Sequence, residues 1–174
     1  MKIKVGLFAG APLLVLTAIF LLSVAPQISG DGIRYTGYVC IYKNGELITC
    51  KHNIITDRGK DLIKMDMMGT DTVTLNVLAV ANNTAGVSAS DTNLQGEWTT
   101  CNLSAVTVTP TSVGTGNWSL SYEFTSTCDS VNVNAVGVYN ETKSGNLFAE
   151  TTWSPTTVLN NGDKLRITYY LWVQ

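Results

Sequence analysis

Hydrophobic and polar residues alternate over most of the chain that follows residue 32. Every second residue is apolar in 118–124 (WSLSYEF) and again in 165–173 (LRITYYLWV). Side chains of a β-strand point to opposite faces in turn, so this pattern predicts half-buried strands. Further strands are predicted over residues 33–43, 46–55, 73–79, 104–109, 131–139 and 146–153. We expect one shared buried face to contain Trp118, Leu120, Tyr122, Phe124, Ile167, Tyr169 and Leu171.

Turn signals separate these strands. Asn44-Gly45, between the first two, is typical of a tight β-hairpin. Residues 160–163 (NNGD) predict a turn before the last strand, and residues 81–96 form a polar loop. Residues 104–109 are predicted to pair with residues 118–124. Many strands with short turns indicate an all-β fold, an antiparallel sandwich or jelly-roll-like domain with one short helix.

The single helix is expected between residues 56 and 68. Thr56 or Asp57 can cap its first turn, and Gly69 can end it. Methionine commonly fills irregular core gaps, so we expect the three methionines of this helix to lie in the core. The residues predicted to face the core are Leu62, Ile63, Met65, Met67 and Met68.

The β-pattern is preceded by two lysines and an apolar run at residues 5–24 (VGLFAGAPLLVLTAIFLLSV). A membrane-spanning helix needs about twenty such residues, whereas the apolar part of a signal peptide has roughly 7–15. The length favours a retained anchor that contacts the membrane through residues 5–24. A signal peptide cut after Gly30 and a prepilin-like cut after Gly6 are the alternatives. The predicted parts are a leader (1–24), a linker (25–32) and an extracytoplasmic β-domain (33–174).

All four cysteines follow the leader, and an even number outside the cytoplasm predicts two disulfides. Each of two cysteine pairs flanks a turn signal, so we expect bonds Cys40–Cys50 and Cys101–Cys128, each closing one hairpin. A two-residue turn would place Cys40 and Cys50 on opposite faces, so the first bond requires an odd-numbered loop. The second requires a bulge to correct the register of residues 104–109.

The net charge of −2 gives no reason to expect a nucleic-acid partner. No Lys or Arg occurs between Met65 and Thr142, although acidic residues continue through this stretch. It is either a sheet surface coated with neutral polar residues or an acidic face that binds cations. His52 is the only histidine and no Cys-x-x-Cys motif occurs, so neither a metal nor a cofactor is expected. The acidic residues are Asp66, Asp71, Asp91, Glu97, Glu123, Asp129 and Glu141.

Candidate sites on an exported chain are sequons and aromatic residues. Three tryptophans, Trp118, Trp153 and Trp172, form either core or a platform for sugar stacking, and core packing is favoured. No Ser-His-acid set or phosphate loop is present, so the chain is not expected to be an enzyme. The N-x-S/T sequons available for glycosylation are Asn82, Asn102, Asn117 and Asn140.

Two stretches resemble a known family. One runs from residue 55 (ITDRGKDLIKMDMM) to 94 (LAVANNTAGVSASDTNL), and the other contains GVYN, SGNLFA and NGDKL within residues 136–172. Together they resemble small all-β structural proteins of tailed-phage and archaeal-virus appendages, over more than half of the exported part. The resemblance implies a structural protein without an active site. The leader and the four cysteines depart from that family and favour a cell surface, a secreted filament or an enveloped virion.

The sequence therefore predicts a non-enzymatic extracytoplasmic subunit that packs with copies of itself in a surface filament, coat or virion. The alternative is a membrane-anchored adhesin or receptor-binding module that acts singly on a cell-surface or glycan partner. Open sheet edges invite pairing between copies, and no Lys blunts them between residues 65 and 142. We expect residues 26–42 to form an arm that pairs with a neighbour. The competing picture keeps residues 33–42 in a hairpin with residues 46–55.

Overall fold

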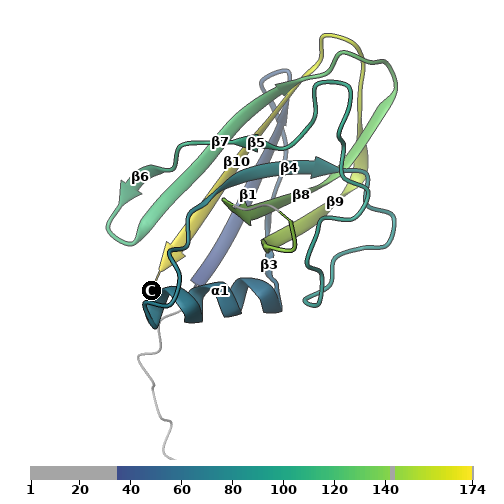
Figure 1. Ribbon diagram of the computed structural model, residues 1–174. Helices are drawn as coiled ribbons and strands as arrows, with labels where there is room; N and C mark the ends of the chain where they lie inside the picture. Colours follow the sequence, from purple (N-terminus) through teal and green to yellow (C-terminus); the bar gives the residue numbers. More distant parts are fainter. Residues whose placement is uncertain (1–34, 142–143, 174) are drawn as a thin grey trace, which may run out of the picture. The chain divides into compact units, whose positions relative to one another are not determined.

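Two five-stranded antiparallel sheets account for most of the domain. The computed structural model describes residues 35–141 and 144–173, so the predicted leader and linker lie outside the described residues. Sheet A has the strand order β2-β1-β10-β7-β6, and sheet B has the order β3-β9-β8-β4-β5 (Figure 1). This arrangement confirms the all-β prediction. The elements are β1 (Tyr35–Lys43), β2 (Glu46–His52), β3 (Ile54–Ile55), α1 (Asp57–Met67), β4 (Leu75–Ala81), β5 (Val106–Thr107), β6 (Thr111–Gly114), β7 (Asn117–Thr125), β8 (Val131–Asn140), β9 (Leu147–Leu159) and β10 (Lys164–Val173).

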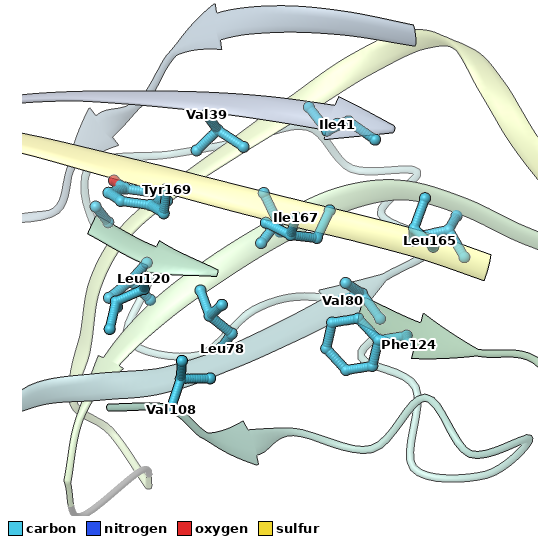
Figure 2. Close-up of a cluster of buried hydrophobic side chains, with 14 of the residues drawn as sticks. Val39, Ile41, Leu78, Val80, Val108, Leu120, Phe124, Leu165, Ile167 and Tyr169 are labelled. Carbon is cyan, nitrogen blue, oxygen red and sulfur yellow. The ribbon is translucent and has the colours of Figure 1, made fainter. Parts of the chain in front are cut away.

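The main core lies between the two sheets. Figure 2 shows side chains of β1, β7 and β10 facing Leu78 and Val80 of β4 and Val108 from the segment after β5. Leu120, Ile167 and Tyr169 are fully buried there. This alternation of buried and outward residues is what the period-two pattern of β7 and β10 predicts.

One member of the predicted buried face is exposed. Tyr122 lies opposite Ile167 in the β7–β10 register, yet 39% of its surface is exposed. The short β6 pairs only with residues 117–119 of β7, so Tyr122 lies beyond the end of β6, at the border of sheet A. The expectation of burial was therefore wrong for this residue.

The first hairpin has a two-residue turn. Asn44 and Gly45 both have positive φ angles, 50° and 86°, as the tightest hairpin turns require. The predicted odd-numbered loop is wrong, because the register is corrected within the strands. Tyr42 pairs with Leu47 but Ile41 pairs with Thr49, so one extra residue forms a bulge. This bulge brings Cys40 opposite Cys50.

Strand β1 is a central strand. It pairs with β2 on one side and with β10 on the other, from Tyr35 opposite Val173 to Lys43 opposite Leu165. The structure therefore has the hairpin of the competing picture, and the exchange of residues 26–42 between copies stays a prediction. Releasing β1 would break hydrogen bonds along both of its sides.

Helix α1 begins and ends at the positions predicted from its capping residues. The Thr56 hydroxyl accepts a hydrogen bond from the Gly59 N–H at 2.9 Å, and Gly69 follows with a φ of 64°. Leu62 is fully buried, but Met67 and Met68 are 64% and 63% exposed. Met67 and Met68 were expected in the core, and for these two residues the expectation is wrong.

The pairing predicted for residues 104–109 is also wrong. β5 pairs with β4 in sheet B, whereas β7 pairs with β6 and β10 in sheet A. The chain crosses between the sheets around Pro110, which has no N–H to donate to a ladder. β4 itself is buried on both faces, because Val77 and Ala79 pack under the loop at residues 82–96 while Leu78 and Val80 face the main core.

Candidate functional site

The two disulfides join the cysteine pairs that flank the turn signals. Cys40–Cys50 crosses the β1–β2 hairpin. Cys101–Cys128 closes no hairpin, contrary to the prediction, because it joins the segment before β5 to the segment between β7 and β8. Disulfides form and persist in oxidising compartments, so the two bonds indicate an extracytoplasmic environment.

The predicted acidic stretch is dispersed over different elements. Glu123 of β7 forms an ion pair with Lys164, and Asp66 of α1 accepts the Val73 N–H. Asp129 accepts the N–H of Asn161 in a turn. Within the described residues, no group of three or more His, Cys, Asp or Glu side chains could hold a metal ion.

A buried carboxyl group lies beneath the loop at residues 82–96. Glu150 of β9 has no exposed surface, and its Oε1 accepts the Ser88 N–H at 3.1 Å. Ser88 N–H also donates to Asp91 Oδ2 at 3.0 Å. Burial, and next the hydrogen bond with the Asp91 carboxylate, raises the pKa of Glu150 to about 8. Glu150 therefore holds a proton at neutral pH.

A tyrosine fastens the same loop. Tyr139 of β8 accepts the Leu94 N–H at 2.6 Å and donates to Glu97 Oε2 at 3.3 Å. Its burial raises the pKa of the Tyr139 hydroxyl well above the ordinary value. Leu94 is buried against Gly137, where an added Cβ would approach the Leu94 side chain to 3.5 Å.

These polar contacts attach a long loop to the outer face of sheet B. Both carboxyl groups near Ser88 contribute to the attachment of this loop, and the Glu150 carboxyl group is sealed from solvent. The sequence pattern did not reveal this group of residues. The one signal was a glutamate directly after the buried run Leu147-Phe148-Ala149.

The three tryptophans lie apart, so the alternative of a shared sugar-stacking platform is wrong, and the favoured core packing holds fully for one of them. Trp153 is buried, with 3% of its surface exposed. Trp118 lines a cavity of about 310 Å³ that also borders Ile63, Phe148 and Leu171. Trp172 is on the opposite face of sheet A, because its neighbour Leu171 points into the core.

Trp172 instead joins three rings on the outer face of sheet A. Its ring is 6.0 Å from Tyr170, nearly parallel at 22°, and 6.2 Å from Tyr38. Tyr38 in turn lies 5.3 Å from the His52 ring, edge to face. We call these four side chains from β1, β2 and β10 the aromatic face.

Neutral polar residues border the aromatic face. The outward residues of β7 next to it are Asn117, Ser119 and Ser121, and Ser121 shares a hydrogen bond of 3.0 Å with Thr168. Charges gather at the other end of the same sheet, where Arg166 stacks 4.3 Å above Tyr42. The ion pairs Lys43–Asp163 and Lys164–Glu123 lie at that end also.

The four sequons differ in their surroundings. Asn140 is 6% exposed, and its Oδ1 accepts the Thr74 N–H at 2.7 Å, so this site is closed in the folded chain. The Asn102 amide donates to the Thr125 carbonyl. Asn82 follows β4 beside the loop, where its backbone N–H donates to Gly96. Asn117, the first residue of β7, lies opposite Trp172.

No family model matches the chain, and searches of curated proteins and of solved structures found no match. The resemblance to viral appendage proteins therefore stays a prediction. Among the described residues, no helix is both long and apolar enough to span a bilayer.

Proposed function

We propose that this chain is a non-enzymatic, extracytoplasmic structural subunit that assembles with copies of itself in a surface filament, coat or virion. The observation that carries the proposal is an open sheet edge. Beyond Ser119, no described strand pairs with the outer side of β7, which leaves residues 120–124 unpaired there. Backbone N–H and C=O groups on such an edge can pair with another chain.

The β7 edge has little of the usual protection against pairing, because its one charged residue, Glu123, is held in an ion pair with Lys164. Residues 120–124 (LSYEF) contain neither Lys nor Pro, and the exposed Tyr122 adds an aromatic side chain to the edge. In contrast, Pro155 interrupts the outer strand β9, and the loop at residues 82–96 bridges to the end of β4 through Ala81 and Glu97. The edge of β7 is thus the surface best suited to pairing.

Pairing of this edge with β2 of another copy would continue sheet A from one subunit to the next. β2 is the opposite edge of the same sheet, so the contact joins two different surfaces and repeats head to tail. Such heterologous contacts generate rings or filaments. The two disulfides and the apolar residues 5–24 support an assembly outside the cytoplasm.

Sedimentation velocity and electron microscopy of the full chain, extracted in detergent, test this proposal. We expect regular assemblies from the wild type and monomers from Tyr122→Lys, because a lysine on the edge opposes pairing. Val158→Lys is the matched control, since Val158 is 45% exposed on β9 of the other sheet and should leave assembly unchanged. Dispersed monomers of the wild type at high concentration would refute the proposal and favour a module that acts singly.

A further inference from the structure

The register of sheet A places a sequon at the border of the aromatic face. Asn117 lies directly opposite Trp172 in the β7–β10 pairing. Opposed residues of antiparallel strands project to the same face, with Cβ atoms about 4.5–5.5 Å apart. Asn117-Trp118-Ser119 is an acceptor sequence for N-glycosylation, so its acceptor amide emerges beside the indole ring.

Asn117 is the sequon that lies next to the rings, and its side chain is available for modification in the folded domain. Among the described residues its amide makes no hydrogen bond, and the side chain is half-buried at the sheet surface. The Asn140 side chain is buried, and the Asn102 amide is occupied by the Thr125 carbonyl. Asn82 belongs to the other sheet, away from the rings.

The chemistry of the aromatic face fits a neutral sugar. The electron-rich face of an aromatic ring attracts the C–H groups of a pyranose, and bordering hydroxyl and amide groups can bond its hydroxyls. The face carries Ser119, Ser121 and Thr168 on its border, whereas the formal charges gather around Arg166 at the other end. A nucleic acid strand would require a positively charged groove here instead.

We propose that Asn117 is N-glycosylated and that the first sugars of this glycan lie on Trp172 and the rings beside it. The donor is a sugar carried on a lipid-linked phosphate. The Asn117 Nδ2 forms a C–N bond with the anomeric carbon and loses a proton to the transferase, while the C–O bond to phosphate breaks and the lipid phosphate leaves. No oxidation or reduction accompanies the transfer.

The attached glycan would shield the outer face of sheet A. This inference rests on the proposed extracytoplasmic location, because lipid-linked donors and their transferases act on exported chains. It does not depend on self-association, since the aromatic face consists of outward side chains of sheet A, whereas the proposed pairing uses the backbone edges of β7 and β2. The two proposals can therefore fail separately.

Glycopeptide mass spectrometry of the full chain, purified from the cells or virions that naturally contain it, tests the modification. We expect a sugar mass on Asn117 and none on Asn140. Non-reducing mapping of the same digest reports whether Cys40–Cys50 and Cys101–Cys128 are formed. A disulfide-bonded chain with unmodified Asn117 overturns this inference alone, whereas a reduced and unmodified chain overturns the location as well.

Thermal unfolding of variants made in the same cells tests the contact with the rings. Asn117→Gln should lower the melting temperature by about 2–4 °C if the contact is worth on the order of 1 kcal/mol. In a Trp172→Ala background the same change should have no further effect, because the ring that holds the sugar is gone. Asn82→Gln is the control and should leave the melting temperature unchanged, because it alters a sequon on the other sheet and keeps the backbone hydrogen bond from Asn82 to Gly96. If the two substitutions lower the melting temperature additively, the glycan does not contact the rings, and this part of the proposal is wrong.

Discussion

Tyr139 and Leu94 are joined by a hydrogen bond of 2.6 Å, in which the backbone N–H of Leu94 donates to the tyrosine hydroxyl. The same loop residue packs its side chain on Gly137, two positions before Tyr139. One contact thus satisfies a buried backbone group and fixes the position of an apolar side chain. It attaches the loop at residues 82–96 to sheet B at the point where Glu97 approaches the same hydroxyl.

Tyr139→Phe should destabilise the protein. The substitution keeps the ring but leaves the Leu94 N–H without its acceptor, which costs about 1–3 kcal/mol for a buried group. Urea unfolding measures this loss as a lower midpoint with an unchanged slope. Tyr122→Phe is the control. Tyr122 is exposed, so this variant should have the same free energy of unfolding as the wild type. Equal stability of Tyr139→Phe and the wild type would mean that the loop does not need this bond.

Tyr169→Phe should not lower the free energy of unfolding, in contrast to Tyr139→Phe. The Tyr169 hydroxyl is fully buried and has no hydrogen-bond partner among the described residues. Burial alone raises the pKa of Tyr169 well above its ordinary value. Removing an unsatisfied hydroxyl should therefore leave the free energy of unfolding unchanged or raise it by about 1 kcal/mol. A loss above that size in the same urea experiment would show that the hydroxyl is bonded.

Glu150→Gln should change how stability depends on pH. Burial raises the pKa of Glu150 from 4.5 to about 8, so the folded chain holds a proton that the unfolded chain releases. The stability from this group is fully present below pH 4.5 and is lost as the pH rises toward 8. The glutamine cannot titrate and still accepts the Ser88 N–H, so the variant should gain stability relative to wild type over this range.

The free energy of unfolding of Glu150→Gln should rise relative to that of the wild type by at most about 1.4 kcal/mol for each pH unit. Urea unfolding at several pH values between 5 and 8 measures it for both proteins. The other groups that face Glu150 are Asp91 and, through Tyr139, Glu97, and both are kept in the variant. Parallel stability profiles for the two proteins would contradict a raised pKa of Glu150.

Leu120→Ala should cost about 2–5 kcal/mol, because the side chain is fully buried between the sheets. Tyr122→Ala, two residues further along the same face of β7, should cost much less, since Tyr122 lies at the exposed border. Comparing the two variants by urea unfolding separates core from border within one strand. A loss under 1 kcal/mol for Leu120→Ala would place that residue outside the core.

Local signals in the sequence predicted local structure well. Asn44-Gly45 indicated the first turn and Thr56 the helix start, because a turn or a cap depends on a few adjacent residues. Period-two alternation identified β7 and β10 as strands, although it could not show that β6 ends before Tyr122. Whether an outward or inward residue is covered depends on neighbours that are distant in sequence.

Strand partners and the polar attachment of the loop could not be read from the sequence. Residues 104–109 were expected beside β7, since sequential strands often pair, but the chain crosses to the other sheet near Pro110. Glu150 and Ser88 are 62 positions apart, and nothing local indicates that they meet. For the aromatic face, the alternation placed Trp172 and Tyr170 on one side of β10, whereas the contribution of Tyr38 required the order of the strands.

The central position of β1 has a mechanical consequence. Interstrand hydrogen bonds run perpendicular to the strands, so a force that enters at Tyr35 along the strand axis shears the β1–β2 and β1–β10 ladders together. A strand at an edge would instead be peeled away one bond at a time. The disulfide at Cys40 prevents β1 from sliding past β2 even when those bonds break. A domain tethered through its N-terminal segment would therefore carry tension through a strand that is hydrogen-bonded on both sides, and we expect it to stay folded under that tension.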